Sequence, residues 1–386
     1  MKRILVLSPS LPLAFGSTDA RWLHVLVSGL SERGHEVACV SCTSDSPKHV
    51  AEAHARAGEL RLRMTHVPFI STERLPVRKL RTAFRPYSQL ARAPGLKAAL
   101  AAELARSPNV FHVEHLFSMW AAPRRVARVL FLHHLEATDW EGRADLTSGE
   151  RFQLAQMRRA TSTLLRRESR IVATTTRLRE EVLAINPRAR VEVVPVTLDA
   201  SLYEMVEPQP GVVGLIGPMH WHPSRSAALR LLRLWHEILQ REPNARLLVA
   251  GWNARKYIGH LFPLQNAELV ERVDHPRDFF TRIGVLVYPP LRGSGMKIKV
   301  LEAMAYGIPV ISNEEGLEGL SVEEDIDALL ATTDEEFIRR TVELLSDPVR
   351  AAAIGRAGRR LVETAYAPSR VIDQLLAVYE ELLPNG

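Results

Sequence analysis

The sequence predicts an α/β protein of two doubly wound, Rossmann-like domains that face a cleft. In both halves of the chain, apolar runs that suit buried strands alternate with stretches of helical periodicity. This alternation is typical of parallel sheets that are covered by helices on both faces. A chain of 386 residues is also too long for one ordinary hydrophobic core. Between the halves, 200-ASLYEMVEPQPG-211 has two prolines, a glycine and little periodicity, which indicates a linker.

The first half begins with a βαβ unit, the building block of parallel sheets. Residues 4–7 form an apolar strand run, 9-PSLPLAFGSTD-19 is a loop that contains Gly16, and 21–33 has apolar residues at helical spacing. Gly34 ends that helix before a strand at 36–40. The other elements predicted in this half are a long polar helix over about 141–168 and strands at 109–115, 129–134, 170–175 and 191–196.

The second half repeats the alternation from residue 212 onward. We predict strands at 212–217, 246–251, 283–289 and 308–312, and helices at 224–240, 296–306, 333–346, 348–366 and 368–383. The expected domains are therefore 1–205 and 206–367, followed by a terminal helical segment, 368–386. Ligands of doubly wound sheets bind at the carboxyl ends of the strands, so a site is expected in the loops that follow strands.

The composition, with 46% hydrophobic and 24% charged residues, is that of a globular protein. No run approaches the roughly 18 consecutive apolar residues of a membrane-spanning helix. The start of the chain, 1-MKRILVLSPSLPLAF-15, is similar to a signal peptide, but prolines interrupt it and no small-residue cleavage site follows. We therefore expect a cytoplasmic protein, with peripheral contact at the inner face of the membrane as an open alternative.

The net charge of +6 indicates an anionic partner. Much of the excess falls in one basic segment, 74–97, which contains Arg74, Arg78, Lys79, Arg81, Arg85, Arg92 and Lys97. Anionic lipid headgroups or a phosphorylated acceptor would suit it, and a solvated arginine-rich face is the simpler alternative. Nucleic acid is not an expected partner, because no aromatic-rich recognition module accompanies the charge.

The two cysteines stand close together in 39-CVSC-42. A metal site or a redox pair would be the functional interpretation of this spacing. No second Cys/His pair stands at zinc-ligand spacing, so we expect two ordinary thiols at the end of a strand.

The segment that follows the predicted strand 283–289 has the residue types of an anion site. Glycines in 290-PLRGSG-295 let a phosphate approach the backbone, and N–H groups at the start of the next helix bind anions. Arg292 and Lys297 would add charge to a diphosphate site. Glu302 lies about six residues into the helix, on the order of 9 Å from the phosphates, a distance that suits a carboxylate on ribose hydroxyls. The alternative is an ordinary loop in which Glu302 and Lys299 form an exposed ion pair.

The segment 291-LRGSGMKIKVLEAMAYGIPVIS-312, followed by 316-GLEGL-320, resembles the donor-nucleotide signature of glycosyltransferase family 4, retaining enzymes of the GT-B fold. It is most similar to the subgroup with a Gly-x-Gly-x-Lys-x-Lys run before a Leu-Glu-Ala-Met-Ala helix. Similar blocks cover nearly the whole chain: 34-GHEV-37, 214-GLIGPMHWHPSRSA-227 and 363-ETAYAPSRVIDQLLAVYEELL-383. The resemblance implies that the terminal helix crosses back onto the first domain.

By this resemblance, the protein transfers a sugar from a nucleoside-diphosphate sugar to an acceptor hydroxyl with retention of configuration. The resemblance implies no metal and no cofactor beyond this co-substrate. The acceptor, a glycan, a lipid-linked sugar or a small molecule, stays open. Glu302 would bind the ribose, and Arg292, Lys297 and the backbone of 293–297 would bind the diphosphate. The implied substrate-binding residues are Gly16, His222, Gly293, Ser294, Gly295, Met296, Glu302 and Glu318.

His133, in 131-FLHHLEAT-138, matches a His-Asn-x-Glu element that lies near the reacting sugar in related enzymes. A capped histidine at a strand end is the alternative, and His112 and His115 are weaker candidates. The chain departs from many relatives at Ser294, where they carry a glutamate that contacts the donor sugar. Alternative functions are a nucleotide-sugar epimerase of related fold, or a non-catalytic protein that binds anions or nucleic acid.

Overall fold

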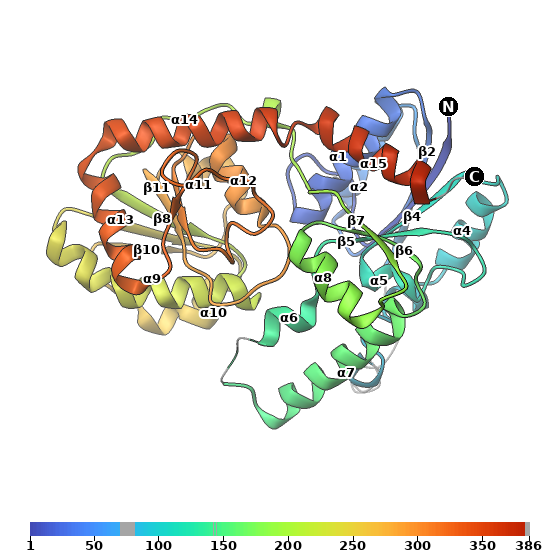
Figure 1. Ribbon diagram of the computed structural model, residues 1–386, viewed down its shortest axis with the longest axis horizontal. Coiled ribbons are helices and arrows are strands. Elements are labelled where there is room, and N and C mark those ends of the chain that lie inside the picture. Colours follow the sequence, from blue (N-terminus) through green and yellow to red (C-terminus); the bar gives the residue numbers. More distant parts are fainter. Residues whose placement is uncertain (70–81, 142, 144, 383–386) are drawn as a thin grey trace. The chain divides into compact units, whose positions relative to one another are not determined.

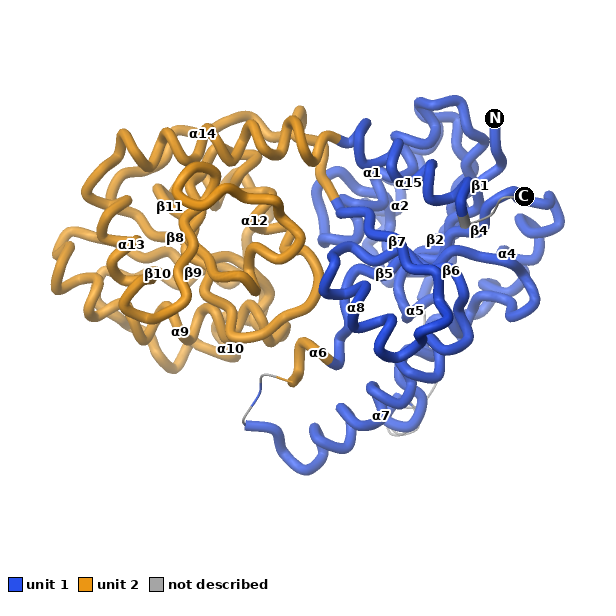
Figure 2. Tube along the Cα trace, viewed as in Figure 1, with its two compact units in different colours: residues 1–137, 143–196, 368–386 blue, residues 138–142, 197–367 orange. Residues whose placement is uncertain are grey.

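The chain forms two compact units, which Figure 2 shows in different colours. The computed structural model describes residues 1–69, 82–141, 143 and 145–382. Unit 1 comprises residues 1–137, 143–196 and 368–386, and unit 2 comprises 138–142 and 197–367. Among the described residues, each unit has one sheet, and every strand pair in both sheets is parallel. The predicted α/β class with two Rossmann-like domains is confirmed.

Unit 1 contains a seven-stranded sheet of order β3-β2-β1-β4-β5-β6-β7 (Figure 1). Its strands are β1 (Arg3–Ser8), β2 (Glu36–Thr43), β3 (Arg63–Pro68), β4 (Val110–Glu114), β5 (Val129–Leu132), β6 (Arg170–Ala173) and β7 (Arg190–Val193). The helices of this part of the chain are α1 (Thr18–Glu32), α2 (Pro47–Glu59), α4 (Leu96–Leu104), α5 (His115–Met119), α6 (Glu136–Glu141), α7 (Ser148–Leu165) and α8 (Thr176–Ile185), with a 3₁₀ turn, η1 (Leu90–Arg92).

The two faces of the unit 1 sheet differ in chemistry. Phe111 and Val113 of β4 belong to a large apolar cluster with side chains of α5, α7 and α8. Because side chains alternate along a strand, His112 and Glu114 lie on the opposite face. On that face Trp22 of α1 stacks on Phe131, with ring centroids 4.8 Å apart. One face is therefore a conventional core, and the other carries buried polar groups.

The terminal helix α15 (Pro368–Leu382) belongs to unit 1, as expected. It packs against α1 so closely that a Cβ atom on Gly29 would lie 2.8 Å from Cγ1 of Ile372. Arg33 donates to Asp373 (2.6 Å) and to the carbonyl of Ser369 (2.7 Å). The fully buried side chains of α15 are Val371, Ile372, Leu375 and Tyr379. The helix is therefore an integral part of the unit 1 core.

Unit 2 contains a six-stranded sheet of order β10-β9-β8-β11-β12-β13. Its strands are β8 (Val212–Ile216), β9 (Arg246–Ala250), β10 (Ala267–Val270), β11 (Val285–Tyr288), β12 (Val310–Ser312) and β13 (Leu329–Leu330). Its helices are α9 (His222–Arg241), α10 (Ala254–Ile258), α11 (Pro276–Phe280), α12 (Ile298–Ala305), α13 (Asp334–Ser346) and α14 (Pro348–Thr364), with 3₁₀ turns η2 (Ala200–Leu202) and η3 (Gly259–Leu261).

The linker predicted at 200–211 is tied to unit 2. The guanidinium of Arg359, on α14, donates to the carbonyls of Ala200 (2.9 Å), Tyr203 (2.6 Å) and Ala305. Unit 2 accordingly begins at Thr197, before the predicted linker. Three carbonyls held by one cation fix the path of this segment over α12 and α14.

Two elements that the sequence analysis did not predict, α2 and β3, have a weak apolar signal. Helix α2 buries only Ala53 and Ala57, and β3 is an edge strand that is mostly half-buried. The predicted helix at 141–168 is shorter because Thr147 and Glu150 form a capping box that starts α7 at Ser148. Among the described helices, none combines the length and apolarity required to cross a membrane.

The thiols of 39-CVSC-42 lie in the middle and at the end of β2. Cys42 faces the large apolar cluster, and Cys39 lies three residues earlier and therefore on the other face of the strand. Burial raises the pKa of each thiol to about 11. Both are buried, free thiols, as the simpler interpretation of the sequence expects.

The close approach of α1 and α15 predicts that Gly29 does not tolerate a larger side chain. Gly29→Val places methyl groups where Ile372 already stands, so we expect a loss of about 1–3 kcal/mol, measured as a lower thermal unfolding midpoint. Gly58→Ala is the matched control, because nothing lies within 4 Å of its added Cβ on α2. Equal midpoints for the two variants would show that the helix contact does not contribute to stability.

Candidate functional site

Three polar side chains follow neighbouring strands at one edge of the unit 1 sheet. Asp19 lies in the first turn of α1, after β1; His115 directly follows β4; and His133 directly follows β5. Strands β1, β4 and β5 are neighbours, and the carboxyl ends of parallel strands meet at one edge. The chain thus gathers Asp19, His115 and His133 into a group that we call the histidine cluster.

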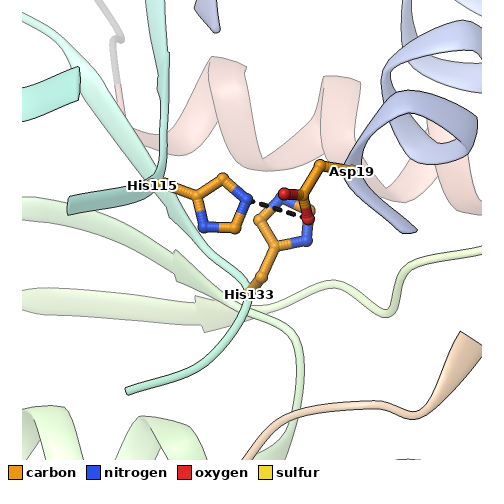
Figure 3. A group of neighbouring side chains, drawn as sticks. All are labelled: Asp19, His115 and His133. Carbon is orange, nitrogen blue, oxygen red and sulfur yellow. Dashed lines mark ion pairs between the residues drawn. The ribbon is translucent and has the colours of Figure 1, made fainter. Parts of the chain in front are cut away.

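The side chains of the histidine cluster are in direct contact (Figure 3). Nε2 of His115 lies 3.1 Å from Oδ1 of Asp19. The rings of His115 and His133 stack with centroids 4.0 Å apart and an angle of 13° between their planes. His115 adopts a left-handed backbone conformation, with φ of 62°, which is uncommon for a residue other than glycine. Backbone strain of this kind is concentrated at functional sites.

The cluster contains an ion pair and a neutral imidazole. Burial lowers the pKa of His115, but the Asp19 carboxylate outweighs burial and raises it above the usual value. Burial also acts to raise the pKa of Asp19, but His115, with smaller contributions from His133 and His134, holds it well below the usual range. The pKa of His133 is lowered by burial and by the adjacent His115. His133 is therefore the member able to accept a proton near neutral pH.

Glu114, the last residue of β4, lies behind His133. Its Oε2 is 2.5 Å from Nε2 of His133, and its Oε1 is 2.6 Å from Nε2 of His112. Trp22 donates its indole N–H to Oε1 at 3.0 Å. Nδ1 of His112 lies 2.6 Å from the hydroxyl oxygen of Tyr379 on α15. His133 is therefore the residue at which a buried hydrogen-bond network ends.

Asp19, His115 and His133 are also close enough to hold a metal ion, because one ligand atom from each lies within 4.8 Å of the others. Such an ion would compete with the His115–Asp19 ion pair and with the proton of His115. Each of these residues therefore already has a partner among the protein side chains. The expectation that the protein needs no metal stays a prediction.

In unit 2, the loop 290–297 follows β11 and precedes α12. The N–H of Gly293 donates to Glu315 (3.0 Å), and the N–H of Ser294 donates to Asp139 (2.8 Å). Asp139 belongs to the short segment 138–142 that the first half of the chain contributes to unit 2. The loop thus binds anionic oxygens through its backbone, but these two donors already hold carboxylates.

Arg292 and Lys297 have different surroundings. Arg292 is partly exposed and lies 3.4 Å from Glu315 and 3.9 Å from Glu141. The side chain of Lys297 is fully buried, and its amine donates to the carbonyls of Ser294 (3.3 Å) and Gly295 (2.5 Å). Arg292 is therefore able to reach a ligand, whereas Lys297 holds the loop together.

Gly293 and Glu318 complete the packing around Lys297. A Cβ atom on Gly293 would lie 3.2 Å from both Cε of Lys297 and Cγ of Pro223. Oε2 of the buried Glu318 lies 3.7 Å from the Lys297 amine. Of the loop residues implied by resemblance, Ser294, Gly295 and Met296 are also buried, and Gly295 takes the left-handed φ of 71°. The loop is a compact, lysine-centred turn.

Lys299 is the second residue of α12, and its amine lies beside Gly217 at the end of the neighbouring strand β8. Its amine donates to the hydroxyl of Ser224 (2.5 Å) and stands over the rings of Tyr288 (4.5 Å) and Trp221 (5.1 Å). A helical projection from Lys297 would place Lys299 on the far side, but Lys297 has extended φ and ψ and α12 starts only at Ile298. The interpretation of Lys299 as an exposed surface cation is therefore wrong.

Burial and a like charge act on Lys299 together. Burial lowers its pKa to about 7, Lys297 acts in the same direction, and Glu302 opposes both. A Cβ atom on Gly217, at the end of β8, would lie 2.3 Å from the Lys299 amine. The glycine therefore leaves the room that the ammonium needs at the carboxyl ends of β8 and β11, which are sheet neighbours.

The other residues implied by resemblance fall on both units. Glu302 is the fifth residue of α12 and is buried. His222 is the first residue of α9, and the neighbouring His220 makes an edge contact with the exposed ring of Trp252. Gly16 lies exposed in the unit 1 loop between β1 and α1. The substrate contacts implied for Glu302, His222 and Gly16 stay predictions.

Sequence reasoning missed Asp19, Glu114, Asp139 and Lys299 as site residues. The alternation 112-HVEH-115 signals polar side chains on one face of a strand and could have indicated Glu114. Asp19 lies three residues after Gly16 in a loop that was already a candidate. Asp139 gave no signal, because the N–H groups that donate to it lie in the second half of the chain.

Two family models match the chain in succession. Residues 20–202 match the model described as Glycosyltransferase Family 4, and residues 210–347 match the model described as Glycosyl transferases group 1. The chain is also 28% identical over 152 residues to the GDP-mannose-dependent monoacylated alpha-(1-6)-phosphatidylinositol monomannoside mannosyltransferase of Corynebacterium glutamicum. That match covers 36% of this chain and only 39% of the relative's length.

Solved structures show the same fold over the full chain length. Sucrose-phosphate synthase from Thermosynechococcus elongatus has a TM-score of 0.75 at 16% identity and covers 100% of both chains. Anabaena HepE, solved in complex with UDP-glucose, has a TM-score of 0.66 at 14% identity and covers 99% of this chain and 100% of its own. At such identities the likeness concerns the fold alone.

The ion pair in the histidine cluster predicts how Asp19→Asn changes the pKa of His115. Without the carboxylate only burial remains as the main effect, so we expect the pKa of His115 to fall below its usual 6.5, measured by NMR titration of the imidazole. The lost stability should be on the order of 1 kcal/mol, because Asp19 is partly exposed.

The sign of the pH dependence follows from the two shifts. The contribution of His115 is lost as pH rises through its raised pKa, and that of Asp19 is lost as pH falls through its lowered pKa. The stability gap between the parent and Asp19→Asn should therefore be widest between the usual pKa of aspartate and the usual pKa of histidine, 6.5. A gap independent of pH would contradict the ion pair.

Proposed function

Because the chain carries both domains of a GT-B glycosyltransferase, we propose that it transfers a sugar from a nucleoside-diphosphate sugar to an acceptor hydroxyl with retention of configuration. The observation that carries the proposal is that Arg292, Lys299 and the buried Glu302 all belong to the loop and helix that follow β11, with the Lys299 amine beside the carboxyl end of β8. Cations at such an edge suit a diphosphate, and a carboxylate one helical turn further suits ribose hydroxyls.

Charge stabilisation on the leaving group is the main catalytic contribution in this proposal. The diphosphate gains negative charge as the glycosidic bond breaks, and Lys299 and Arg292 are held in place before it arrives. By resemblance to the glycosyltransferase family, His133 lies near the reacting sugar, and a neutral ring suits a hydrogen-bond acceptor for a hydroxyl of the transferred sugar.

Retention without an enzymic nucleophile is the second part of the proposal. The carboxylates of the histidine cluster and its network are engaged, since Asp19 pairs with His115 and Glu114 accepts from His133. The leaving phosphate then takes the acceptor proton on the same face of the sugar. We also propose that transfer needs no metal, because the two cations neutralise the diphosphate; turnover that persists in a chelator would agree.

The decisive measurement is release of nucleoside diphosphate from a panel of nucleoside-diphosphate sugars, with and without a panel of acceptors. We expect release that depends on acceptor, together with a product of retained anomeric configuration. Product formation from the donor sugar alone, with the nucleotide still attached, would favour the epimerase alternative. A chain that binds donors but never releases diphosphate would contradict the proposed transfer.

Lys299→Ala should lower turnover more than it lowers donor affinity, because the diphosphate charge grows in the transition state. Loss of one preorganised donor of this kind typically costs about 100- to 1000-fold in rate. Lys256→Ala is the matched control: this lysine of the same unit lies over Tyr257 on α10, away from β11. Equal turnover in the two variants would remove Lys299 from the diphosphate site.

We further propose that unit 1 touches an anionic membrane surface where it meets its acceptor. Phe84 and Phe152 are exposed and form an edge-to-face pair with centroids 5.5 Å apart. Arg85 and, on α7, Arg158 and Arg159 are exposed close to them in sequence. Exposed aromatic rings beside basic residues suit a lipid interface. Of the basic segment, Arg74, Arg78, Lys79 and Arg81 lie outside the described residues.

The double variant Phe84→Ser/Phe152→Ser should bind vesicles containing phosphatidylserine about 10-fold more weakly than the parent in a sedimentation assay, because two apolar side chains no longer enter the interface. Val349→Ser, which removes an exposed apolar side chain from α14 of unit 2, is the control. Parent protein that does not sediment with these vesicles, or equal binding by both variants, would contradict membrane contact.

A further inference from the structure

A continuous buried hydrogen-bond network connects the terminal helix with His133. The hydroxyl of Tyr379 lies 2.6 Å from Nδ1 of His112, whose Nε2 lies 2.6 Å from Oε1 of Glu114. The second oxygen, Oε2, lies 2.5 Å from Nε2 of His133. All four side chains are at most 5% exposed. Of these residues, the sequence indicated His133 and, as a weaker candidate, His112.

The chemistry of the members assigns the protons of this network. An ionised carboxylate only accepts, so both histidines must donate to Glu114 through Nε2–H. Trp22 is a donor only, and it supplies a third hydrogen bond to the same carboxylate. With the hydrogen of His112 on Nε2, its Nδ1 accepts the hydroxyl hydrogen of Tyr379. Every atom between α15 and His133 has one consistent role.

The charge state of Glu114 agrees with this assignment. Burial by itself would raise the pKa of the Glu114 carboxyl, but His133 and His112 together hold it well below the usual range. Burial and the Glu114 charge raise the pKa of Tyr379, so its hydroxyl keeps the hydrogen that it donates. These shifts support the hydrogen-bond directions, which rest on the distances and on the donor inventory.

We propose that Glu114, His112 and Tyr379 are positioning residues that fix His133 in the tautomer with its hydrogen on Nε2 and its acceptor on Nδ1. The inference rests on the proposed function, in which His133 acts at the reacting sugar. In the wrong tautomer the ring would present a hydrogen where an acceptor is needed. The terminal helix thus packs in the core of unit 1 and also contributes to catalysis through the hydroxyl of Tyr379.

A purely structural role for this network is the competing explanation. Burying a carboxylate and two imidazoles costs desolvation free energy. Apolar side chains of similar volume would hold α15 in place at least as well. Such contacts already hold the helix in place: Val371, Ile372 and Leu375 are fully buried, and Arg33 forms an ion pair with Asp373. The polar network is therefore not needed to attach the helix.

The groups around His133 determine which of its ring nitrogens carries the hydrogen. They are Glu114 from β4, His115 from α5, Asp19 from α1 and the adjacent His134. Because His115 and Asp19 pair with each other, Glu114 is the partner that sets which nitrogen of His133 carries the hydrogen.

Two conservative variants test the proposal on the full chain. Tyr379→Phe keeps the ring that packs in the core and removes only the hydroxyl, and Glu114→Gln keeps the shape and removes the charge. We expect kcat to fall about 10-fold in Tyr379→Phe and about 100-fold in Glu114→Gln, with KM for the donor unchanged. Tyr87→Phe is the matched control, a buried tyrosine on the other face of the same sheet, whose hydroxyl lies 3.4 Å from Thr161.

The tautomer is read directly by ¹⁵N NMR of the imidazoles, with His133→Asn to assign the resonances. The parent should show His133 protonated at Nε2, and Glu114→Gln should shift the ring toward the other tautomer or a mixture. If Glu114→Gln does not fold, Tyr379→Phe carries the test, since a role limited to packing would leave its kcat equal to that of Tyr87→Phe.

The outcomes separate this inference from the proposed function. Normal transfer by Tyr379→Phe and Glu114→Gln, or an unchanged His133 tautomer in Glu114→Gln, overturns the inference alone. A parent that transfers no sugar overturns the proposed function, and with it a catalytic role for the network. A selective loss of kcat together with a changed tautomer supports both.

Discussion

A parallel sheet brings the carboxyl ends of all its strands to one edge, and both candidate sites depend on this constraint. The central strands are covered by helices and are mostly apolar, so most of the polar side chains that can act on a ligand lie at this edge. In unit 1 the neighbours β1, β4 and β5 deliver Asp19, His115 and His133, which are far apart in the sequence. In unit 2 the neighbours β8 and β11 bring Ser224 within reach of Lys299.

Segments from elsewhere in the chain complete each unit. Residues 138–142 join unit 2, where Asp139 accepts hydrogen bonds from Ser294 and Trp221. The terminal helix joins unit 1, where Tyr379 reaches His112. Each unit therefore lacks part of its polar network if it is considered as one continuous stretch of sequence. Because each unit includes a segment from the other half of the chain, the boundaries of the two units differ from the linker that the sequence predicts at 200–211.

The sequence predicts the fold well because periodicity is a property of neighbouring residues. The βαβ unit at the start, the strand before the 290–297 loop and the terminal helix each carry a local pattern, and each is present. Site contacts depend on strand order, which no local pattern encodes. Lys299 shows this clearly: a helical projection from Lys297 fails because Lys297 is extended, and the partner of Lys299, Ser224, begins another helix.

The two lysines of the signature argue for a division of roles within one short segment. The amine of Lys297 is fully buried on loop carbonyls and beside Glu318, so its charge is already compensated and shapes the loop. Lys299 has a hydroxyl and two aromatic rings as neighbours, and burial lowers its pKa to about 7. An incoming diphosphate would favour the charged form of this amine, because a nearby opposite charge raises the pKa of a lysine. A cation whose charge the ligand stabilises in this way is suited to an anion whose charge grows during reaction.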